Sequence, residues 1–257
     1  MKVRLHVRSG RRETREFADR LVASFAAGGV TVIDENPGAD MVVAVGGDGT
    51  MLSAVATAVE LDVPVIGFNL GTIGFLTAAD PADMVDVVGR LATGDFGVEN
   101  RMTVAATVGD RTVLGVNDVV IEKVDSQRLI ELNVTIGSVD FVNYRADGLI
   151  VATPTGSTAY SFSAGGPLVS PGLDALVLTP VAAHSLFSRS VVIEPDQEIL
   201  VRVTRDRAVK VSVDKTNLGQ IGQGDTVMIR QGSRPAQFVT LDPPSFAGLV
   251  KSKFDLP

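Results

Sequence analysis

The sequence predicts an α/β plus all-β protein, in which an N-terminal open parallel α/β domain of the Rossmann-like type precedes a β-sandwich domain. Three observations predict it. Strand-like and helix-like segments alternate over the first part of the chain, which is typical of a parallel sheet. Short β-type runs separated by turns fill most of the remainder. A buried valine-rich run ends in a cluster of glycines. We therefore assign residues 1–97 to the α/β domain and 98–241 to the β-sandwich, with 242–257 as a helical C-terminal segment.

The first domain starts with a strand over Lys2–Arg8, where apolar and polar residues alternate. Glu13–Ala27 carries apolar residues at helical spacing, and Gly28 follows as the stop signal. Pro81 favours the first turn of a later helix, with Asp80 as the capping residue. The further strands expected here are Val30–Ile33, Met41–Val45 and Val63–Phe68, and the further helices are Met51–Leu61 and Pro81–Leu91.

The second domain is predicted from β-type runs that follow one another with turns between them. A helical spacing of apolar residues returns only in the tail, from Ser245 to Phe254. The strands expected in this part are Met102–Val108, Val116–Glu122, Leu129–Ile136, Leu149–Thr153, Ala175–Pro180, Val191–Glu194, Ile199–Val203, Val209–Val213, Val227–Ile229 and Gln237–Leu241.

The glycine cluster is Gly46-Gly47-Asp48-Gly49-Thr50, between the run Val42–Val45 and the helix expected from Met51. At such a strand-to-helix turn the helix N-terminus presents free backbone N–H groups, and glycines let the backbone approach a phosphate. A carboxylate there would repel a phosphate that binds alone. Asp48 fits better as a group that orients or deprotonates a hydroxyl beside the phosphate, as phosphoryl transfer requires. The plainer alternative is an ordinary turn in which Asp48 caps the helix.

Two further polar segments occur at or beside predicted strands, as the glycine cluster does. Asn69–Thr77 follows the next strand, so its glycines are expected to border the same crevice at the carboxyl ends of the strands. Asn117 and Asp118 lie inside an apolar strand pattern, with side chains on opposite faces. Either this pair contacts a ligand, or it is a bulge or a solvent-facing pair.

The longest signal is an uncharged stretch, Gly148–Leu173, that is rich in serine, threonine and glycine. Its three prolines and its many polar residues argue against a membrane span. A strand, a Pro-Thr-Gly turn and a short helix over Ser157–Ala164 are expected, with clustered hydroxyl groups suited to a ribose, a phosphate or an amide. Tyr160 offers a flat face or a hydroxyl for a ligand.

Composition limits the function further. The net charge of −7 argues against general nucleic-acid binding and requires local donors for any anionic ligand. The chain has no cysteine, which excludes thiolate metal sites, and only His6 and His184 could supply imidazole. We therefore expect no metal site built from the protein alone. The N-terminus lacks the apolar core of a signal peptide, and a cytoplasmic location is expected.

Taken together, these segments resemble the NAD kinase family over nearly the whole chain. Gly46–Thr50 resembles the first motif of the family, Asn69–Leu76 the second and Asn117-Asp118 the third. Asp147–Pro167 resembles its glycine-rich region. The first motif is shared with diacylglycerol-type lipid kinases and phosphofructokinases, whereas the four motifs in this order are highly specific.

The resemblance implies phosphorylation of the adenosine ribose 2′-hydroxyl of NAD to give NADP, with ATP or polyphosphate as donor and Mg²⁺ or another divalent metal. It implies homodimers or homotetramers of an α/β domain and a β-sandwich domain. Asp48 would be the catalytic residue that engages the hydroxyl. The donor phosphates would be held by Gly46, Gly47, Gly49 and Thr50. The residues that would bind NAD are Gly49, Phe75, Asn117, Asp118, Arg128, Arg145, Asp147, Thr158, Ala159, Tyr160 and Ser163.

Asp214 resembles a late acidic position that is followed by Gly or His in many members, whereas Lys215 follows here. Two other functions stay open. A diacylglycerol-type lipid kinase would share only the first motif and would need an acyl cleft and membrane association. A non-catalytic dinucleotide sensor would bind NAD without turnover.

Overall fold

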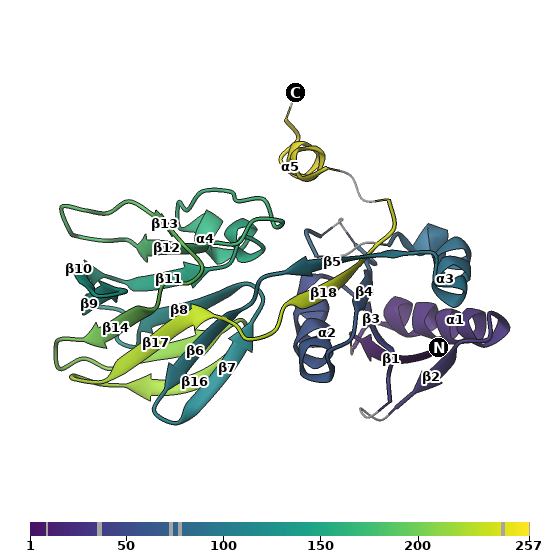
Figure 1. Cartoon of the computed structure of the whole chain (residues 1–257), viewed down its shortest axis with the longest axis horizontal. Helices are drawn as coiled ribbons and strands as arrows, with labels where there is room; N and C mark the ends of the chain where they lie inside the picture. Colours follow the sequence, from purple (N-terminus) through teal and green to yellow (C-terminus); the bar gives the residue numbers. More distant parts are fainter. Residues whose placement is uncertain (9, 35–37, 72–73, 77–78, 243–244, 257) are drawn as a thin grey trace. The chain divides into compact units, whose positions relative to one another are not determined.

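The computed structural model describes residues 1–8, 10–34, 38–71, 74–76, 79–242 and 245–256 (Figure 1). These residues form two compact units. Unit 1 comprises residues 1–100 and 236–257, and unit 2 comprises residues 101–235. The predicted combination of an α/β domain and a β-sandwich is confirmed.

Unit 1 is built on a six-stranded sheet with the order β2-β1-β3-β4-β18-β5. β1, β2, β3, β4 and β18 form a chain of parallel pairs. The strands are β1 (Lys2–Val7), β2 (Thr31–Ile33), β3 (Met41–Val45), β4 (Val65–Phe68), β18 (Ala236–Thr240) and β5 (Gly97–Arg101).

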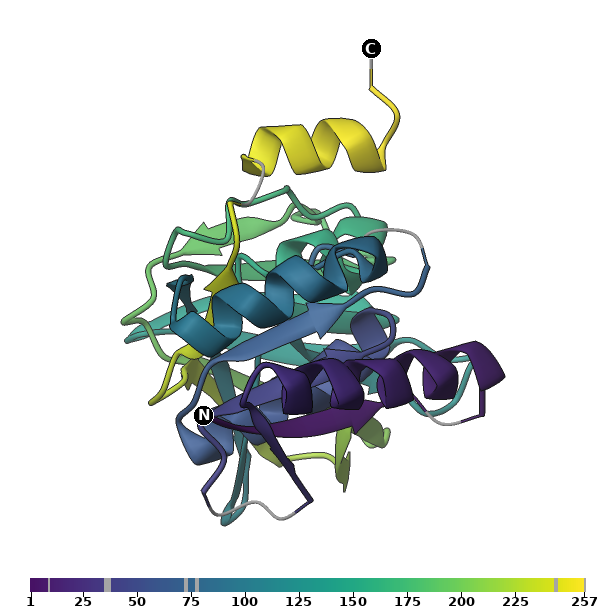
Figure 2. The same ribbon diagram turned by 90° about the vertical axis from the view of Figure 1, so that its right-hand side faces the viewer.

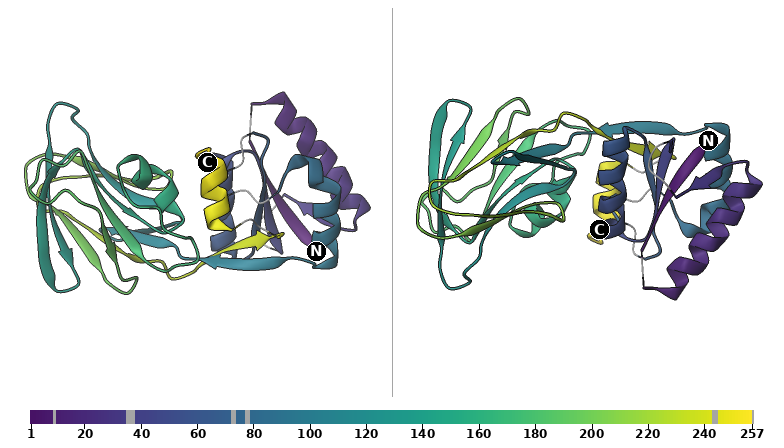
Figure 3. Two further views of the ribbon diagram at one scale, coloured as in Figure 1. Left: turned by 90° about the horizontal axis from the view of Figure 1, so that it is seen from above. Right: turned by 90° about the horizontal axis from the view of Figure 1, so that it is seen from below.

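The helices of unit 1 cover both faces of this sheet. α1 (Arg12–Ala27) and α3 (Met84–Thr93) lie side by side on one face (Figure 2). α2 (Asp48–Leu61) lies on the other face (Figure 3). Because both faces are covered, β3 and β4 are buried along their whole length, which explains their uninterrupted apolar sequences. α5 (Phe246–Lys253) ends the chain.

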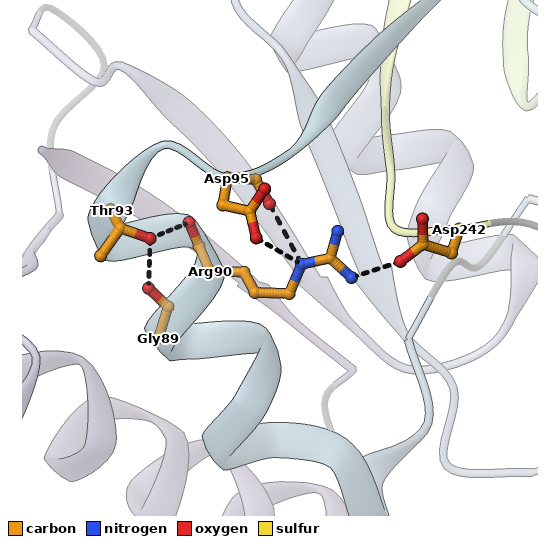
Figure 4. A network of polar contacts seen from close by, with 5 residues as sticks. All are labelled: Gly89, Arg90, Thr93, Asp95 and Asp242. Carbon is orange, nitrogen blue, oxygen red and sulfur yellow. Dashed lines mark hydrogen bonds and ion pairs between the residues drawn. The ribbon is translucent and has the colours of Figure 1, made fainter.

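The start of α3 agrees with the predicted cap. Asp80 accepts a hydrogen bond from the amide of Ala82 at 2.8 Å, and Pro81 opens a short 3₁₀ helix, Pro81–Asp83, that leads into α3. At the other end of α3, Arg90 contacts Asp95 and donates to Asp242 at 2.8 Å (Figure 4). This network joins α3 to the segment that follows β18 within unit 1.

The place of β18 differs from the sequence analysis, which put this strand in the β-sandwich. β18 pairs with β4 at Phe238↔Val65 and completes the parallel sheet of unit 1 instead. Its side chains Ala236, Phe238 and Val239 are buried. The sequence does not reveal this place, because an apolar strand pattern does not specify which sheet the strand joins.

Unit 2 is a sandwich of two antiparallel six-stranded sheets with the orders β10-β9-β14-β17-β6-β7 and β13-β12-β11-β8-β15-β16. Inward-facing apolar side chains from both sheets form one core. The strands of the first sheet are β6 (Val104–Val108), β7 (Arg111–Gly115), β9 (Ile130–Ile136), β10 (Val139–Ala146), β14 (Ile199–Val203) and β17 (Thr226–Gln231). Those of the second are β8 (Asp118–Lys123), β11 (Gly148–Ala152), β12 (Leu176–Val181), β13 (Val191–Ile193), β15 (Val209–Val213) and β16 (Thr216–Ile221).

The helix expected over Ser157–Ala164 is divided in the structure. A 3₁₀ turn, Gly156–Thr158, is followed by the single turn α4 (Tyr160–Ser163). Ala159 separates the two because its backbone (φ −101°, ψ −127°) is not helical. α4 packs on β11.

Candidate active site

The carboxyl ends of three neighbouring strands meet at one edge of the sheet in unit 1. β1 is followed by Arg8, β3 by Gly46 and β4 by Asn69, and the pairings between these strands are parallel. β2 ends earlier, since its last residue Ile33 pairs with Arg4. The order β2-β1-β3-β4 reverses direction between β1 and β3. Open α/β sheets bind ligands at such a reversal. At this reversal the amide of Arg8 donates to the carbonyl of Val45 at 3.0 Å.

The glycine turn lies directly beside the reversal. Gly46 has φ +152°, and a Cβ there would lie 2.5 Å from Thr50 Oγ1, so only glycine fits. Gly47 is the N-cap of α2, and Asp48 is the first helical residue. No side-chain capping bond is made, so the alternative in which Asp48 caps the helix is wrong. The exposed carboxylate of Asp48 lies instead in the first turn, at the positive end of the helix dipole.

Gly74 fits closely against Asp48. A Cβ at Gly74 would overlap Oδ1 of Asp48, so the carboxylate occupies the space that any other residue would fill. The predicted association of the second motif with the Asp48 turn is therefore seen at Gly74. Thr72, Ile73 and Thr77 of that motif lie outside the described residues.

A cavity of about 250 Å³ opens in front of the turn. Three cationic side chains line it: Arg8 and Arg11 from the connection between β1 and α1, and Lys253 from α5. Local positive charge thus faces this cavity in a chain of net charge −7, as an anionic ligand requires. The other lining residues are Glu13, Thr14, Gly46, Gly47, Asp48, Asn69, Leu70 and Gly71.

Sequence reasoning missed these three cations. Arg8 could have been found, because it directly follows the first strand and so falls at the same edge as Gly46. Lys253 carried no such signal, since its approach depends on the packing of α5. In the structure the Lys253 ammonium lies 5.5 Å from the ring centroid of Phe75, and the ring of Phe254 lies 6.5 Å from the same ring.

In unit 2, Asn117 and Asp118 lie at the start of β8 and are held by Asp214. The carboxylate of Asp214 accepts hydrogen bonds from three consecutive amides, those of Val116, Asn117 and Asp118, at 2.9, 2.9 and 3.2 Å. In return, the amide of Asp214 donates to the Asp118 carbonyl at 2.9 Å. Asp214 has φ +49°, a backbone conformation that aspartate tolerates better than most residues. These bonds give Asp214 a positioning role for the Asn117–Asp118 segment.

The environment of Asp118 favours its neutral form. Only 6% of Asp118 is exposed. Burial first, and the nearby Asp214 second, raise the pKa of Asp118 to about 7. Burial also raises the pKa of Asp214, although its three backbone hydrogen bonds oppose this effect. The three amides thus stabilise the ionised form of Asp214.

The hydroxyl-rich turn packs directly on Asn117. Thr153 donates from its amide to the Asn117 carbonyl at 2.8 Å and from its hydroxyl to the Val116 carbonyl at 2.5 Å. A Cβ at Gly156 would overlap the Asn117 carbonyl oxygen, so only glycine allows this approach. The turn leads into Thr158 and Ala159, which are half-buried, and then into Tyr160 and Ser163, which are exposed. The structure therefore brings the third motif and the glycine-rich region together.

Three other predicted residues lie elsewhere in unit 2. Asp147 pairs with Lys123 at the opposite end of β8 from Asp118. Arg145 contacts Glu131 at 3.2 Å, and Arg128 contacts Asp125 at 3.7 Å. β8 and β11 are antiparallel, with Asp118 opposite Ala152 and Glu122 opposite Gly148. The five residue steps between the two ends of β8 correspond to roughly 17 Å, so these side chains do not join the Asn117–Asp118 group within this sheet.

The described part of the chain contains no group of three or more His, Cys, Asp or Glu side chains arranged to hold a metal ion. No helix in it is long and apolar enough to cross a membrane.

Comparison with known proteins decides the family. Residues 9–96 match the ATP-NAD kinase N-terminal domain, and residues 116–241 match the ATP-NAD kinase C-terminal domain. The chain belongs to the NAD kinase family. It is similar to the NAD kinase of Heliobacterium modesticaldum, with 39% identity over 83% of this chain and 78% of that protein. It is also 40% identical to the NAD kinase of Nocardia farcinica, over 86% of this chain and 70% of that protein.

Solved structures of NAD kinases agree. The crystal structure of an NAD kinase from Archaeoglobus fulgidus in complex with ATP has a TM-score of 0.82 and 25% identity, covering 100% of both chains. That of yeast NADH kinase complexed with NADH has a TM-score of 0.89 and 23% identity, covering 100% of this chain and 88% of that chain, and shows the shared fold. The chain is an enzyme, a kinase that phosphorylates NAD. The lipid kinase and the non-catalytic sensor are not favoured.

Proposed function

We propose that Asp48 is the catalytic residue and that it acts on the adenosine ribose 2′-hydroxyl of NAD. The observation that carries this proposal is the place of its carboxylate, at the N-terminus of α2 beside a cavity lined by three cations. An aspartate is a weak base, so Asp48 orients the hydroxyl and takes its proton late, as the phosphoryl group transfers. The loose transition state of this reaction needs positioning and charge stabilisation most of all.

The donor phosphates lie at the same turn in this proposal. The turn that contains Gly46, Gly47, Gly49 and Thr50 lies against these phosphates, and Arg8, Arg11 and Lys253 provide positive charge. The donor is ATP or polyphosphate; both carry the terminal phosphoanhydride that the reaction breaks. In an acidic chain these local cations offset the repulsion of a polyanion by the overall field.

A divalent metal such as Mg²⁺ fits this cavity. Mg²⁺ in phosphoryl-transfer sites is held by one or two carboxylates together with substrate phosphates and water. Glu13 and Asp48 are the two carboxylates that line the cavity, and Asn69 adds an amide. The metal would neutralise charge on the donor, and Glu13 is the protein group best suited to hold it while Asp48 engages the hydroxyl.

In unit 2, we propose that Asn117, Asp118, Thr158, Ala159, Tyr160 and Ser163 bind NAD, as Gly49 and Phe75 do in unit 1. Arg128, Arg145 and Asp147 are proposed to bind NAD as well. These three residues lie at the opposite end of β8 from Asp118. A homodimer or homotetramer is also part of the proposal. A cytoplasmic location remains part of the proposal.

The test is to supply purified protein with NAD, Mg²⁺ and either ATP or polyphosphate and to measure NADP. Asp48→Asn keeps the shape of the side chain and should lower kcat by about 10²- to 10⁴-fold. Asp86→Asn, which changes an exposed carboxylate on α3, is the matched control and should leave kcat unchanged. Circular dichroism should show that both variants fold. Near-normal turnover by Asp48→Asn would reassign its role.

A further inference from the structure

A second and larger cavity adjoins the Asp48 cavity in unit 1. Its volume is about 660 Å³, and it is lined by β1, by β2 and by α1 with the residues just before it. Arg8 and Arg11 line both cavities, so the two share a wall. Anything bound at the glycine turn and extending past these two arginines enters the second cavity.

The second cavity combines two kinds of surface. Aliphatic side chains from three elements line it: Leu5 and Val7, Val22, and Val32 and Ile33. Polar groups complete the lining: the guanidinium groups of Arg4 and Arg15 and the carboxylates of Asp19 and Asp34. Among the described residues, no ion pair or side-chain hydrogen bond engages Arg4, Arg15 or Asp34, so their charges are available to a ligand.

Asp34 has a particular position in this cavity. It directly follows β2, whose last residue Ile33 pairs with Arg4, so Asp34 lies beside Leu5, roughly 10 Å along β1 from Arg8. In βαβ nucleotide-binding units, an acidic residue about 20 residues beyond the phosphate-binding turn, at the end of the second strand, binds the ribose hydroxyls. The connection from Arg8 through α1 to Asp34 has this layout, with arginines in place of the usual glycines.

We propose that this second cavity binds the nucleoside of a nucleoside triphosphate donor, with Asp34 accepting hydrogen bonds from its ribose hydroxyls. The proposal rests on the kinase function proposed above, which places the donor phosphates at the glycine turn. The aliphatic side chains and the flat guanidinium groups form the contact surface for the base. Arg8 and Arg11 bridge the two cavities and pair with the phosphates between them.

The lining favours a nucleoside over a longer chain of phosphates. The aliphatic wall offers a polyphosphate no hydrogen bonds, and the carboxylates of Asp19 and Asp34 offset part of the attraction that the four arginines of the lining exert on it. A purine base with a ribose matches both features.

The reaction balances without any further reactant. The bond between the terminal phosphorus and its bridging oxygen breaks, and a bond forms from that phosphorus to the 2′-oxygen of NAD. The nucleoside diphosphate leaves with the bridging oxygen and its electron pair, and the hydroxyl proton passes to Asp48. The nucleoside itself takes no part in bond making, so its subsite acts on donor affinity.

The experiment compares Asp34→Ala with wild type. With ATP as donor, the variant should raise KM for ATP about 10-fold with little change in kcat, because a charged hydrogen-bond acceptor is lost from binding alone. With 2′,3′-dideoxy-ATP, which lacks both hydroxyls, wild type and variant should have the same KM. Polyphosphate-driven turnover, where the enzyme shows it, should not change. Asp40→Ala is the control, since Asp40 lies at the start of β3, at the opposite edge of the sheet.

Binding of Mg-ATP measured by calorimetry provides a readout that does not depend on turnover. The dissociation constant should rise about 10-fold in Asp34→Ala and stay constant in Asp40→Ala. An unchanged dissociation constant overturns the subsite, even if NADP is formed. A variant that loses polyphosphate-driven turnover as strongly as ATP-driven turnover overturns it too, because the cavity would then hold phosphates. Absence of NADP with every donor would instead count against the kinase function, while the binding result still decides the subsite.

Discussion

The buried carboxyl of Asp118 makes the stability of unit 2 depend on pH, and Asp118→Asn should remove that dependence. Burial and the nearby Asp214 raise the pKa of Asp118 from 3.8 to about 7. Between these values the folded state keeps a proton that the unfolded chain has lost. The contribution of Asp118 is therefore fully present below about pH 4 and is lost as the pH rises through 7.

The difference in pKa gives the size of the effect. One pKa unit corresponds to roughly 1.4 kcal/mol, so the whole interval corresponds to roughly 4 kcal/mol. Unfolding is conveniently measured between about pH 5.5 and pH 8. Over this range the same linkage relation predicts that the contribution of Asp118 to the free energy of unfolding falls by roughly 2 kcal/mol. Asparagine has nearly the same shape as aspartate and does not titrate. The Asp118→Asn variant should therefore not lose this part of the free energy of unfolding as the pH rises.

Urea unfolding followed by circular dichroism at the two pH values measures the effect. The free energy of unfolding of wild type relative to Asp118→Asn should fall by roughly 2 kcal/mol from the lower to the higher pH. Asp110→Asn, in the exposed turn between β6 and β7, is the control and should follow wild type. Parallel pH profiles for wild type and Asp118→Asn would refute the reasoning, since the carboxyl would then be ionised in the folded state.

Two further substitutions test the packing of unit 2. Gly156→Ala should destabilise the fold by roughly 1–3 kcal/mol in urea unfolding, because its Cβ would overlap the Asn117 carbonyl oxygen, whereas Gly222→Ala, where a Cβ meets nothing within 4 Å, should cost less. Equal effects would contradict the close approach. Tyr144→Phe should keep or raise the melting temperature, since the buried Tyr144 hydroxyl has no hydrogen-bond partner among the residues that the structure describes. Removing it relieves a desolvation cost of roughly 1 kcal/mol or more; a clear loss of stability would contradict this reasoning.

The sequence was most informative where local and tertiary requirements coincide. The sequence predicts β3 and the glycine turn after it closely. A strand that is buried on both faces must be apolar, and a turn that lets a phosphate approach the backbone needs glycine. Edge strands were less visible. β10 and β16 are end members of their sheets and carry polar residues along much of their length, so no apolar run marked them.

Side chains that meet from distant segments could not be predicted from the sequence. Arg8 and Lys253 are far apart in the chain and converge only through the sheet and α5. Lys215 follows Asp214 where many family members have Gly or His, so the sequence leaves the role of Asp214 in doubt, yet its carboxylate accepts hydrogen bonds from three amides around Asn117. Its function depends on a β15–β8 pairing that the strand patterns do not specify.

The return of the chain to β18 has a consequence for biosynthesis and for gene dissection. Residues 101–235, which form the sandwich, lie between the two parts of unit 1 in the sequence. The ribosome therefore synthesises the whole sandwich before β18, the strand that lies between β4 and β5 in the sheet of unit 1. A protein cut near residue 100 would expose an unpaired apolar edge at β4 and invite aggregation. An isolated α/β half therefore requires splicing residue 100 to residue 236 through a short linker, rather than a stop codon.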